Sequence, residues 1–213
     1  MKKLICFDLD NTLVYSDKAH ISACNEALKK LGLKEKSSNF LKNLFGMPHS
    51  EIARILLAKF NKKLSNQFLI YYNKFLIQNC NYVKAIPGVK KTLIKLSKNY
   101  DLAILSNCSK STIKATLKGA KINLKLFKIL IGNDNVKRSK PYPDEILKAE
   151  KLEHHKPYFM VGDSIYDIIA GNKAKVKTIA VLTGHSSKNK LKKYHPNFIL
   201  KSVNEVLRLL NFL

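Results

Sequence analysis

The sequence has few cysteines, few arginines and no long hydrophobic run. The four cysteines are widely spaced and form no C-x-x-C pair, which argues against zinc binding or a disulfide framework and fits a reducing compartment. The apolar run after Lys2 and Lys3 ends after four residues, too soon for a signal peptide, and no later stretch reaches membrane-spanning length. We therefore expect a cytoplasmic protein with no membrane partner. The cysteines are Cys6, Cys24, Cys80 and Cys108.

Acidic residues are scarce, so the formal net charge is +24, from 39 basic and 15 acidic residues. Such a charge could attract nucleic acid. However, only Arg54, Arg138 and Arg208 are arginines, the residue that base reading and bidentate phosphate binding favour, and the lysines are spread over every segment. We expect no specific nucleic-acid partner, although an anionic substrate would be attracted. A basic nucleic-acid-associated protein is the remote alternative, and it would require lysines gathered on one face.

From residue 83 onward, predicted strands alternate with predicted helices. The chain of 213 residues, 46% of them apolar, can form one core with an insertion. A further strand, at residues 4–7, precedes this region. Strands alternating with helices predict an α/β fold, a Rossmann-like parallel sheet with helices on both faces. The expected helices are 87–98, 111–117, 143–152, 164–174 and one from 203, and the expected strands are 102–105, 127–131, 158–161, 177–182 and 197–200.

Residues 16–82 show only helical periodicity. Apolar residues recur at helical spacing over 18–31, and further helices are expected at 39–45, 50–60 and 66–79. We find no convincing strand in this segment. The sequence thus predicts an α/β core made of residues 1–15 and 83–213, interrupted by an all-helical domain at 16–82.

The first strand ends at two carboxylates, Asp8 and Asp10. The carboxyl ends of parallel strands open onto the ligand crevice of an α/β sheet, and residues two apart on an extended chain point to the same side. Two like charges so close together need a cation or a shared proton, so a divalent metal is a candidate. The alternative is a polar strand end followed by a turn at Asn11, and the D-x-D pattern alone does not decide between the two.

Three further groups of polar residues follow or flank later strands. Ser106 and Asn107 end the strand at 102–105, before a helix whose N-terminus favours an anion. Asp163 ends the strand at 158–161, with Asp167 one helical turn later. Lys140 lies between these two strands, just before a proline-rich helix start. Each residue alone has an ordinary explanation, since Ser106 and Asp163 also suit helix N-caps. Their combination and order indicate one site.

Taken together, these motifs resemble those of the haloacid dehalogenase-like hydrolases over nearly the whole chain. Within that family the chain is similar to the subgroup of phosphoglycolate phosphatases and β-phosphoglucomutases, in which a small helical cap closes over the site. We call residues 16–82 the cap. Its Ser16 and His20, and the segment 46–52, also resemble that subgroup. The four matching motifs are Asp8-Leu9-Asp10-Asn11-Thr12, Leu105-Ser106-Asn107, Lys140-Pro141, and Val161-Gly162-Asp163-Ser164 with Asp167.

The resemblance implies a role for each carboxylate. Asp8 would be the nucleophile that takes the phosphoryl group, and Asp10 would protonate the leaving group and then activate water. Mg²⁺ would be held by the Asp8 carboxylate, the Asp10 backbone carbonyl and Asp163. Asp167 would orient Lys140 or a metal-bound water.

The resemblance also implies phosphate-binding residues. Ser106 and Lys140 would bind the phosphoryl oxygens, with assistance from Asn107. In the cap, His20 and Lys42 are candidate substrate contacts, although a histidine on such a helix can also be purely structural.

The activity implied is that of a Mg²⁺-dependent phosphatase acting on a small phosphorylated metabolite, either phosphoglycolate-like or a sugar phosphate. The alternatives are an inorganic pyrophosphatase and a β-phosphoglucomutase-like phosphotransferase. The Gly-Asp-Ser form of the fourth motif favours a phosphatase over a mutase. The presence of Asp10 argues against a dehalogenase, because family members that cleave carbon–halogen bonds lack this acid. The sequence leaves the oligomeric state open.

Overall fold

The core of the protein is a six-stranded parallel sheet with strand order β5-β4-β1-β6-β7-β8. The computed structural model describes residues 2–58 and 62–212. Because β1 lies in the centre, between β4 and β6, its carboxyl end opens at the middle of the sheet edge. The strands are β1 (Lys3–Phe7), β4 (Tyr100–Ser106), β5 (Ile129–Gly132), β6 (Phe159–Gly162), β7 (Lys177–Val181) and β8 (Phe198–Leu200).

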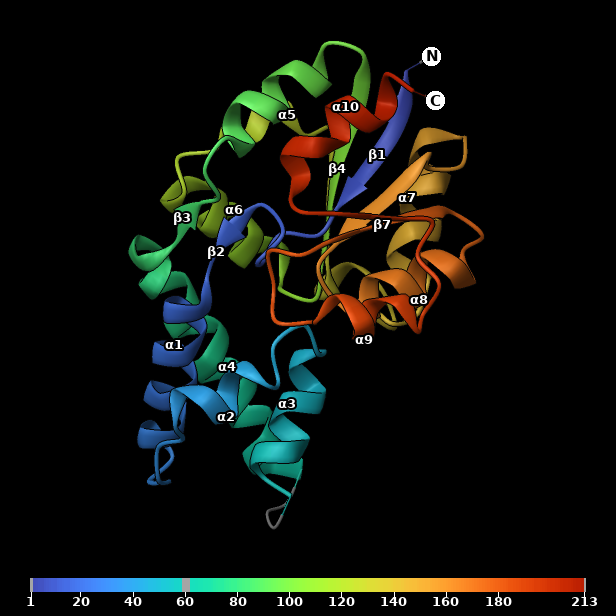
Figure 1. The fold of residues 1–213 in the computed structure, drawn as a ribbon. Coiled ribbons are helices and arrows are strands. Elements are labelled where there is room, and N and C mark those ends of the chain that lie inside the picture. Colours follow the sequence, from blue (N-terminus) through green and yellow to red (C-terminus); the bar gives the residue numbers. More distant parts are fainter. Residues whose placement is uncertain (1, 59–61, 213) are drawn as a thin grey trace.

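Helices cover both faces of this sheet, as the alternating pattern predicts (Figure 1). Ile5 and Phe7 of β1 pack in the same core cluster as buried residues of α5, α6 and α10. Leu4 and Cys6 point to the opposite face and pack with residues of α7 and α8. The predicted α/β fold is confirmed. The helices are α5 (Val89–Ser97), α6 (Lys110–Gly119), α7 (Asp144–Glu153), α8 (Ile165–Lys173), α9 (Lys188–Lys192) and α10 (Val206–Leu210).

The cap consists of four helices that lie together at one end of the molecule, apart from the sheet (Figure 1). Its two long helices bury residues spaced four apart, such as Ala19, Ala23 and Ala27 on α1 and Phe68 and Tyr72 on α4. Each therefore presents one apolar stripe to the cap interior. The helices are α1 (Asp17–Lys30), α2 (Ser38–Lys42), α3 (His49–Leu56) and α4 (Lys62–Gln78).

The two chain segments that connect the cap to the core pair with each other. β2 (Val14–Tyr15) and β3 (Lys84–Ala85) form a short antiparallel pair, in which Val14 lies opposite Ala85. The sequence did not predict this pair, because two residues are too few to show an alternating pattern.

Other elements differ from the prediction mainly at their ends. The helix expected at 50–60 runs from His49 to Leu56, and positions 59 and 60 of that prediction lie outside the described residues. Helix α9 was not predicted, because it is rich in lysine and buries only Leu191. Short 3-10 turns precede or follow several elements: η1 (Asn79–Tyr82), η2 (Leu124–Leu126), η3 (Asn133–Asn135) and η4 (Val203–Glu205).

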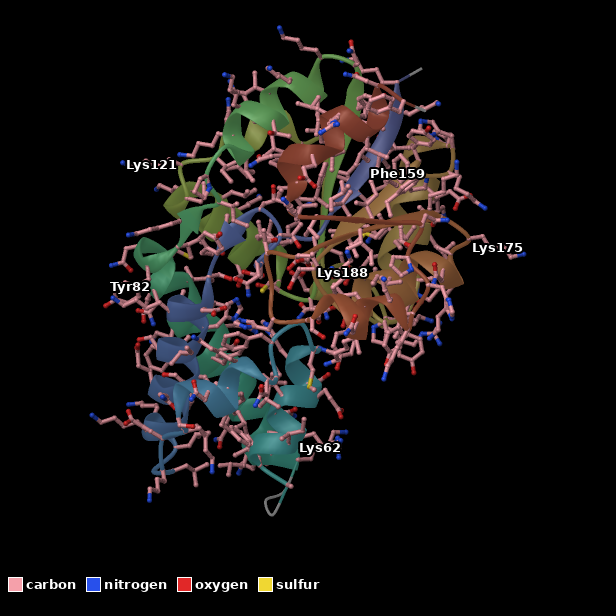
Figure 2. The ribbon with its side chains drawn as sticks, in the orientation of Figure 1. Lys62, Tyr82, Lys121, Phe159, Lys175 and Lys188 are labelled. Atoms are coloured by element: carbon pink, nitrogen blue, oxygen red, sulfur yellow. The ribbon has the colours of Figure 1, made fainter. Side chains whose placement is uncertain are left out.

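The fold also bears on what the composition led us to expect of the cysteines, of membrane-spanning segments and of the lysines. All four cysteines are buried and unpaired. Within 2–58 and 62–212, no helix combines the length and the apolar character needed to cross a membrane. The lysines labelled in Figure 2, among them Lys62, Lys121 and Lys175, project from well-separated elements.

Candidate active site

Asp8 and Asp10 follow β1, but their side chains have different partners. The Asp8 backbone N–H donates to the Val161 carbonyl at 2.8 Å, which keeps Asp8 in line with the sheet. The chain then turns at Asn11, whose φ of +57° lies in the left-handed region that Asn tolerates. Strand β1 ends at Phe7, so Asp8 and Asp10 lie beyond it. The expectation that side chains two residues apart point to the same side holds only within an extended strand, and it does not apply to Asp10. Both carboxylates line one cavity, with Asp8 facing the core and Asp10 facing the cap.

Lys140 is a completely buried cation at the centre of the site. Its ammonium donates to Asp8 Oδ1, Asp167 Oδ1 and the Leu105 carbonyl, each at 2.7 Å. All three N–H bonds are therefore used. Burial alone would lower the pKa of Lys140, but the neighbouring carboxylates of Asp167 and Asp8 raise it well above its ordinary range.

Three carboxylates, those of Asp8, Asp163 and Asp167, come within 4.8 Å of one another. Gly162 makes this approach possible, since a Cβ there would lie 2.2 Å from the Asp167 carboxyl carbon. Thr12 Oγ1 lies 3.1 Å from both Asp8 Oδ2 and Asp163 Oδ1, so its single hydroxyl proton bridges the two acids.

This acidic cluster carries more negative charge than Lys140 neutralises. Burial is the main reason that the pKa of Asp8 rises to about 7, and Asp167 and Asp10 raise it further while Lys140 opposes them. Burial, Asp8 and Asp167 likewise raise the pKa of Asp163 well above its usual range. A divalent cation would relieve this repulsion, and an all-oxygen donor set suits a hard ion. The cluster is thus a candidate metal site.

Ser106 and Asn107, at the end of β4, lie beside Lys140 in the cavity wall. Ser106 Oγ accepts the Cys108 N–H at 3.1 Å, which leaves the Ser106 hydroxyl proton free to donate. The Asn107 amide donates to the Gly46 carbonyl at 3.0 Å and to the Lys140 carbonyl at 3.2 Å. Asn107 therefore ties the cap to the core in this structure.

On the cap side, Asp10 meets His20, a candidate cap contact from the sequence, and through it and Cys108 it meets residues that the sequence did not indicate. His20 Nε2 lies 3.1 Å from Asp10 Oδ1, and His20 Nδ1 lies 2.6 Å from the Tyr72 hydroxyl. The Cys108 thiol donates to Asp10 Oδ2 at 3.4 Å and lies 3.7 Å from His49 Nε2. Although burial would raise the pKa of Asp10, His20 and Cys108 hold it below its usual range.

The cavity between these two sides has a volume of about 40 Å³, enough for a few water molecules or a compact group. Of the two candidate cap contacts, His20 lines this cavity. Lys42 does not, and its ammonium faces Asp17 at 4.0 Å on the protein surface. The sequence-predicted residues found in the wall are Asp8, Asp10, His20, Ser106, Asn107, Lys140, Asp163 and Asp167.

Four further residues of the site were missed at the level of sequence. Thr12 stood within the first motif and could have been found there. Tyr72 is buried on an apolar helix face, where a core residue is the ordinary expectation, but its hydroxyl reaches His20. His49 and Cys108 gave no signal, because nothing in a linear sequence brings a cap helix to the loop after β4.

Comparison with known proteins agrees with the fold and the motifs. Residues 5–181 match the family model described as haloacid dehalogenase-like hydrolase. The chain is 30% identical over 212 residues to the pyrophosphatase PpaX of Oceanobacillus iheyensis, covering 96% of this chain and 95% of that protein. It is 31% identical over 215 residues to a phosphoglycolate phosphatase of Aquifex aeolicus, covering 98% and 97%.

Solved structures show the same fold. A crystal structure of a predicted phosphatase from Clostridium acetobutylicum superposes with a TM-score of 0.88 at 23% identity, over the full length of both chains. A hydrolase from Pseudomonas syringae gives a TM-score of 0.85 at 21% identity, covering 100% of this chain and 99% of that one. The family match spans most of the chain and confirms the resemblance seen in the four motifs, so this protein belongs to the haloacid dehalogenase-like hydrolases and is an enzyme of their phosphatase type.

Proposed function

We propose that the protein is a Mg²⁺-dependent phosphatase that hydrolyses a small phosphorylated metabolite through an aspartyl-phosphate at Asp8. The observation that carries this proposal is the meeting of Asp8, Lys140 and Asp163 in the wall of one cavity. A carboxylate beside a fixed cation and an acidic cluster is an arrangement suited to phosphoryl transfer, in which positioning and charge neutralisation supply most of the catalysis.

The residues present fit a magnesium ion. The Asp8 and Asp163 carboxylates would hold it together with the backbone carbonyl of Asp10, an all-oxygen set that hard cations prefer. When bound, Mg²⁺ supplies neutralisation of the negative charge on the phosphoryl group and the acids. Thr12, which bridges Asp8 and Asp163, keeps the two carboxylates in position.

The side chains around Asp8 have separate roles in this proposal. Lys140 orients Asp8 through Oδ1, and Oδ2, which accepts the Thr12 hydroxyl in this structure, would attack phosphorus. The Ser106 hydroxyl and Lys140 would bind phosphoryl oxygens, with one Lys140 N–H exchanging its present acceptor for the substrate. Asp10, once protonated, would give that proton to the leaving oxygen and later take one from the attacking water. His20, 3.1 Å from Asp10, holds that carboxyl in place.

The cap is the part that would choose the substrate. The core groups all act on the phosphoryl end, whereas His20, Phe45 and Tyr72 form the wall that faces the rest of the substrate. The small cavity suits a small metabolite, phosphoglycolate-like or a sugar phosphate, and closure of the cap would exclude water. A protein or nucleic-acid substrate would not fit such a space.

Inorganic pyrophosphate is the second candidate substrate. The similarity to PpaX, a pyrophosphatase, equals that to the phosphoglycolate phosphatase within one percentage point of identity. Pyrophosphate has no carbon skeleton and therefore needs little room on the cap side.

The test is a hydrolysis screen of phosphorylated metabolites and pyrophosphate, with Mg²⁺ or with a chelator. We expect Mg²⁺-dependent release of phosphate from a small substrate, and a loss of at least about 10⁴-fold in kcat for Asp8→Asn, which is nearly isosteric but cannot attack. Asp101→Asn is the matched control, since this aspartate at the start of β4 pairs with Lys128 and does not line the cavity. An active Asp8→Asn enzyme would refute the covalent mechanism.

A further inference from the structure

A second group of potential metal ligands lies in the cavity beside the acidic cluster. Ligand atoms of Asp10, His20 and Cys108 lie within 4.8 Å of one another. Unlike the all-oxygen cluster at Asp8, this group offers one oxygen, one nitrogen and one sulfur. Imidazole and thiolate are ligands of zinc and other transition metals, whereas Mg²⁺ prefers oxygen.

His49 supplies a fourth donor. It is only 5% exposed, it lines the cavity, and its Nε2 lies 3.7 Å from Cys108 Sγ. Its other nitrogen, Nδ1, makes no hydrogen bond in the part of the chain that the structure describes.

We propose that these residues form a second metal site, selective for Zn²⁺ and similar transition metals, with four ligands: Asp10, His20, His49 and Cys108. Two ligands come from the core loops after β1 and β4, and two come from cap helices α1 and α3. An ion bound here joins the cap to the core.

Three of the six separations between donors lie close to the edges of a zinc tetrahedron. Zn–N and Zn–O bonds of about 2.0–2.1 Å and a Zn–S bond of about 2.3 Å give edges of about 3.3 Å between N and O, and about 3.6 Å from sulfur to either. The observed separations are 3.1 Å from His20 Nε2 to Asp10 Oδ1, 3.4 Å from Cys108 Sγ to Asp10 Oδ2, and 3.7 Å from Cys108 Sγ to His49 Nε2. Asp10, His20 and Cys108 can therefore take an ion with small movements of their side chains, whereas His49, which lies outside the group of donors within 4.8 Å of one another, must move further to bind it.

The surroundings of His20 also suit a metal ligand. Its Nδ1 lies 2.6 Å from the Tyr72 hydroxyl. The tautomer that carries its proton on Nδ1 donates to Tyr72 and leaves the Nε2 lone pair for the ion, which is the usual outer contact of a ligating histidine. On binding, Cys108 loses its thiol proton to the buffer and coordinates as a thiolate.

Occupation of this site would stop turnover for two reasons, both of which rest on the proposed function. The ion holds the Asp10 carboxylate, which then cannot exchange a proton with the leaving group. It also keeps the cap closed on the core, which slows exchange of substrate and product. The zinc site would thus act as an inhibitory site next to the catalytic one.

The test is direct binding to the full-length, metal-free protein in excess Mg²⁺, with a chromophoric chelator as competitor for Zn²⁺. We expect one Zn²⁺ per chain that Mg²⁺ does not displace. Cys108→Ala should weaken its affinity at least about tenfold, since loss even of an outer-shell partner commonly costs that much. Cys80→Ala is the matched control, because the thiol of this buried cysteine bonds Leu76 and Thr116 instead.

Absorption spectroscopy with Co²⁺ provides a second measurement. It does not depend on turnover, and its main result comes from the wild-type protein. The wild-type protein and Cys80→Ala should show near-ultraviolet thiolate-to-cobalt absorption in excess Mg²⁺, and Cys108→Ala should lack it. Zn²⁺ should also inhibit hydrolysis at a site that added Mg²⁺ does not compete for. Displacement of all Zn²⁺ by Mg²⁺, absence of the thiolate absorption in the wild type, or an unchanged Zn²⁺ affinity in Cys108→Ala would each overturn the proposal, whatever the substrate proves to be.

Discussion

The core side and the cap side of the cavity differ in the polar groups that they bury and in how those groups are paired. On the core side, three carboxylates crowd around one ammonium, and every Lys140 N–H is used. On the cap side, the histidines contact aromatic rings, and His49 Nδ1 has no hydrogen-bond partner among the described residues. The core side therefore has an excess of negative charge, and the cap side has unused donors and acceptors.

This difference suits a division of roles in which the core side carries out phosphoryl transfer and the cap side determines which substrate binds. Fixed charges at strand ends are held rigidly by the sheet, as phosphoryl transfer requires. Neutral rings on helices provide a surface that can differ from one relative to another without disturbing those charges. Asp10 belongs to both sides, because it follows β1 and yet bonds to His20 of the cap.

Replacing Asp10 breaks the link between the two sides, and its effect on turnover should be second only to that of Asp8→Asn. We expect Asp10→Asn to lower kcat by about 10²–10⁴-fold, since the amide can neither donate a proton to the leaving group nor accept one from water. The loss should be smaller for substrates with acidic leaving groups, which need little protonation. Steady-state kinetics with a series of aryl phosphates measures this, and an equal loss for every leaving group would contradict the acid–base role.

Replacing Lys140 removes the one cation that the core side contains within hydrogen-bonding distance of Asp8 and Asp167. We expect Lys140→Met to lower the free energy of unfolding by about 3–5 kcal/mol in metal-free protein, because two buried carboxylates lose their partner. Urea denaturation followed by circular dichroism measures this. The control is Arg54→Met, which removes an exposed ion pair with Glu51 and should cost far less stability, because solvent screens the pair. Similar losses in both variants would show that Lys140 is not a structural cation.

The core side could be predicted from the sequence, and most of the cap side could not. Asp8, Ser106 and Asp163 follow strands of one parallel sheet, so the order of strands alone brings them together. The contacts of Cys108 with His49, and of Asn107 with Gly46, join residues about 60 positions apart across two domains. Their proximity depends on how the cap helices dock, which helical periodicity does not specify.

Glu145 is a further buried carboxyl close to Lys140, and its ionisation should make the stability of the protein depend on pH. Burial raises its pKa to about 7, although Lys140 opposes this shift. The folded protein thus keeps a proton that the unfolded chain loses near pH 4.5, so stability present below that pH is lost as the pH rises through about 7. Between pH 6 and 8 this loss should be about 1 kcal/mol.

Glu145→Gln should remove that part of the pH dependence, because the amide does not titrate. Urea unfolding of metal-free protein at pH 6 and pH 8 measures the difference, with the exposed Glu35→Gln as control. If Glu145→Gln and the wild type lose the same stability over this range, the buried carboxyl is not the cause.

Tyr72 provides the finest test of the cap side, since its effect reaches the chemistry only through His20. The ring stacks on Phe68, with centroids 5.6 Å apart, and Tyr72→Phe keeps this packing while removing the hydroxyl that bonds His20 Nδ1. The lost hydrogen bond is worth about 1 kcal/mol, and without it His20 should position the Asp10 carboxyl less well. We therefore expect kcat to fall about fivefold. Tyr71→Phe, at the next position of α4, is the matched control and should leave kcat unchanged. Because His20 would act only by positioning Asp10, the Tyr72→Phe effect should disappear in an Asp10→Asn background. A double-mutant cycle measures this coupling, and additive losses would show that Tyr72 and His20 act on the substrate by a separate route.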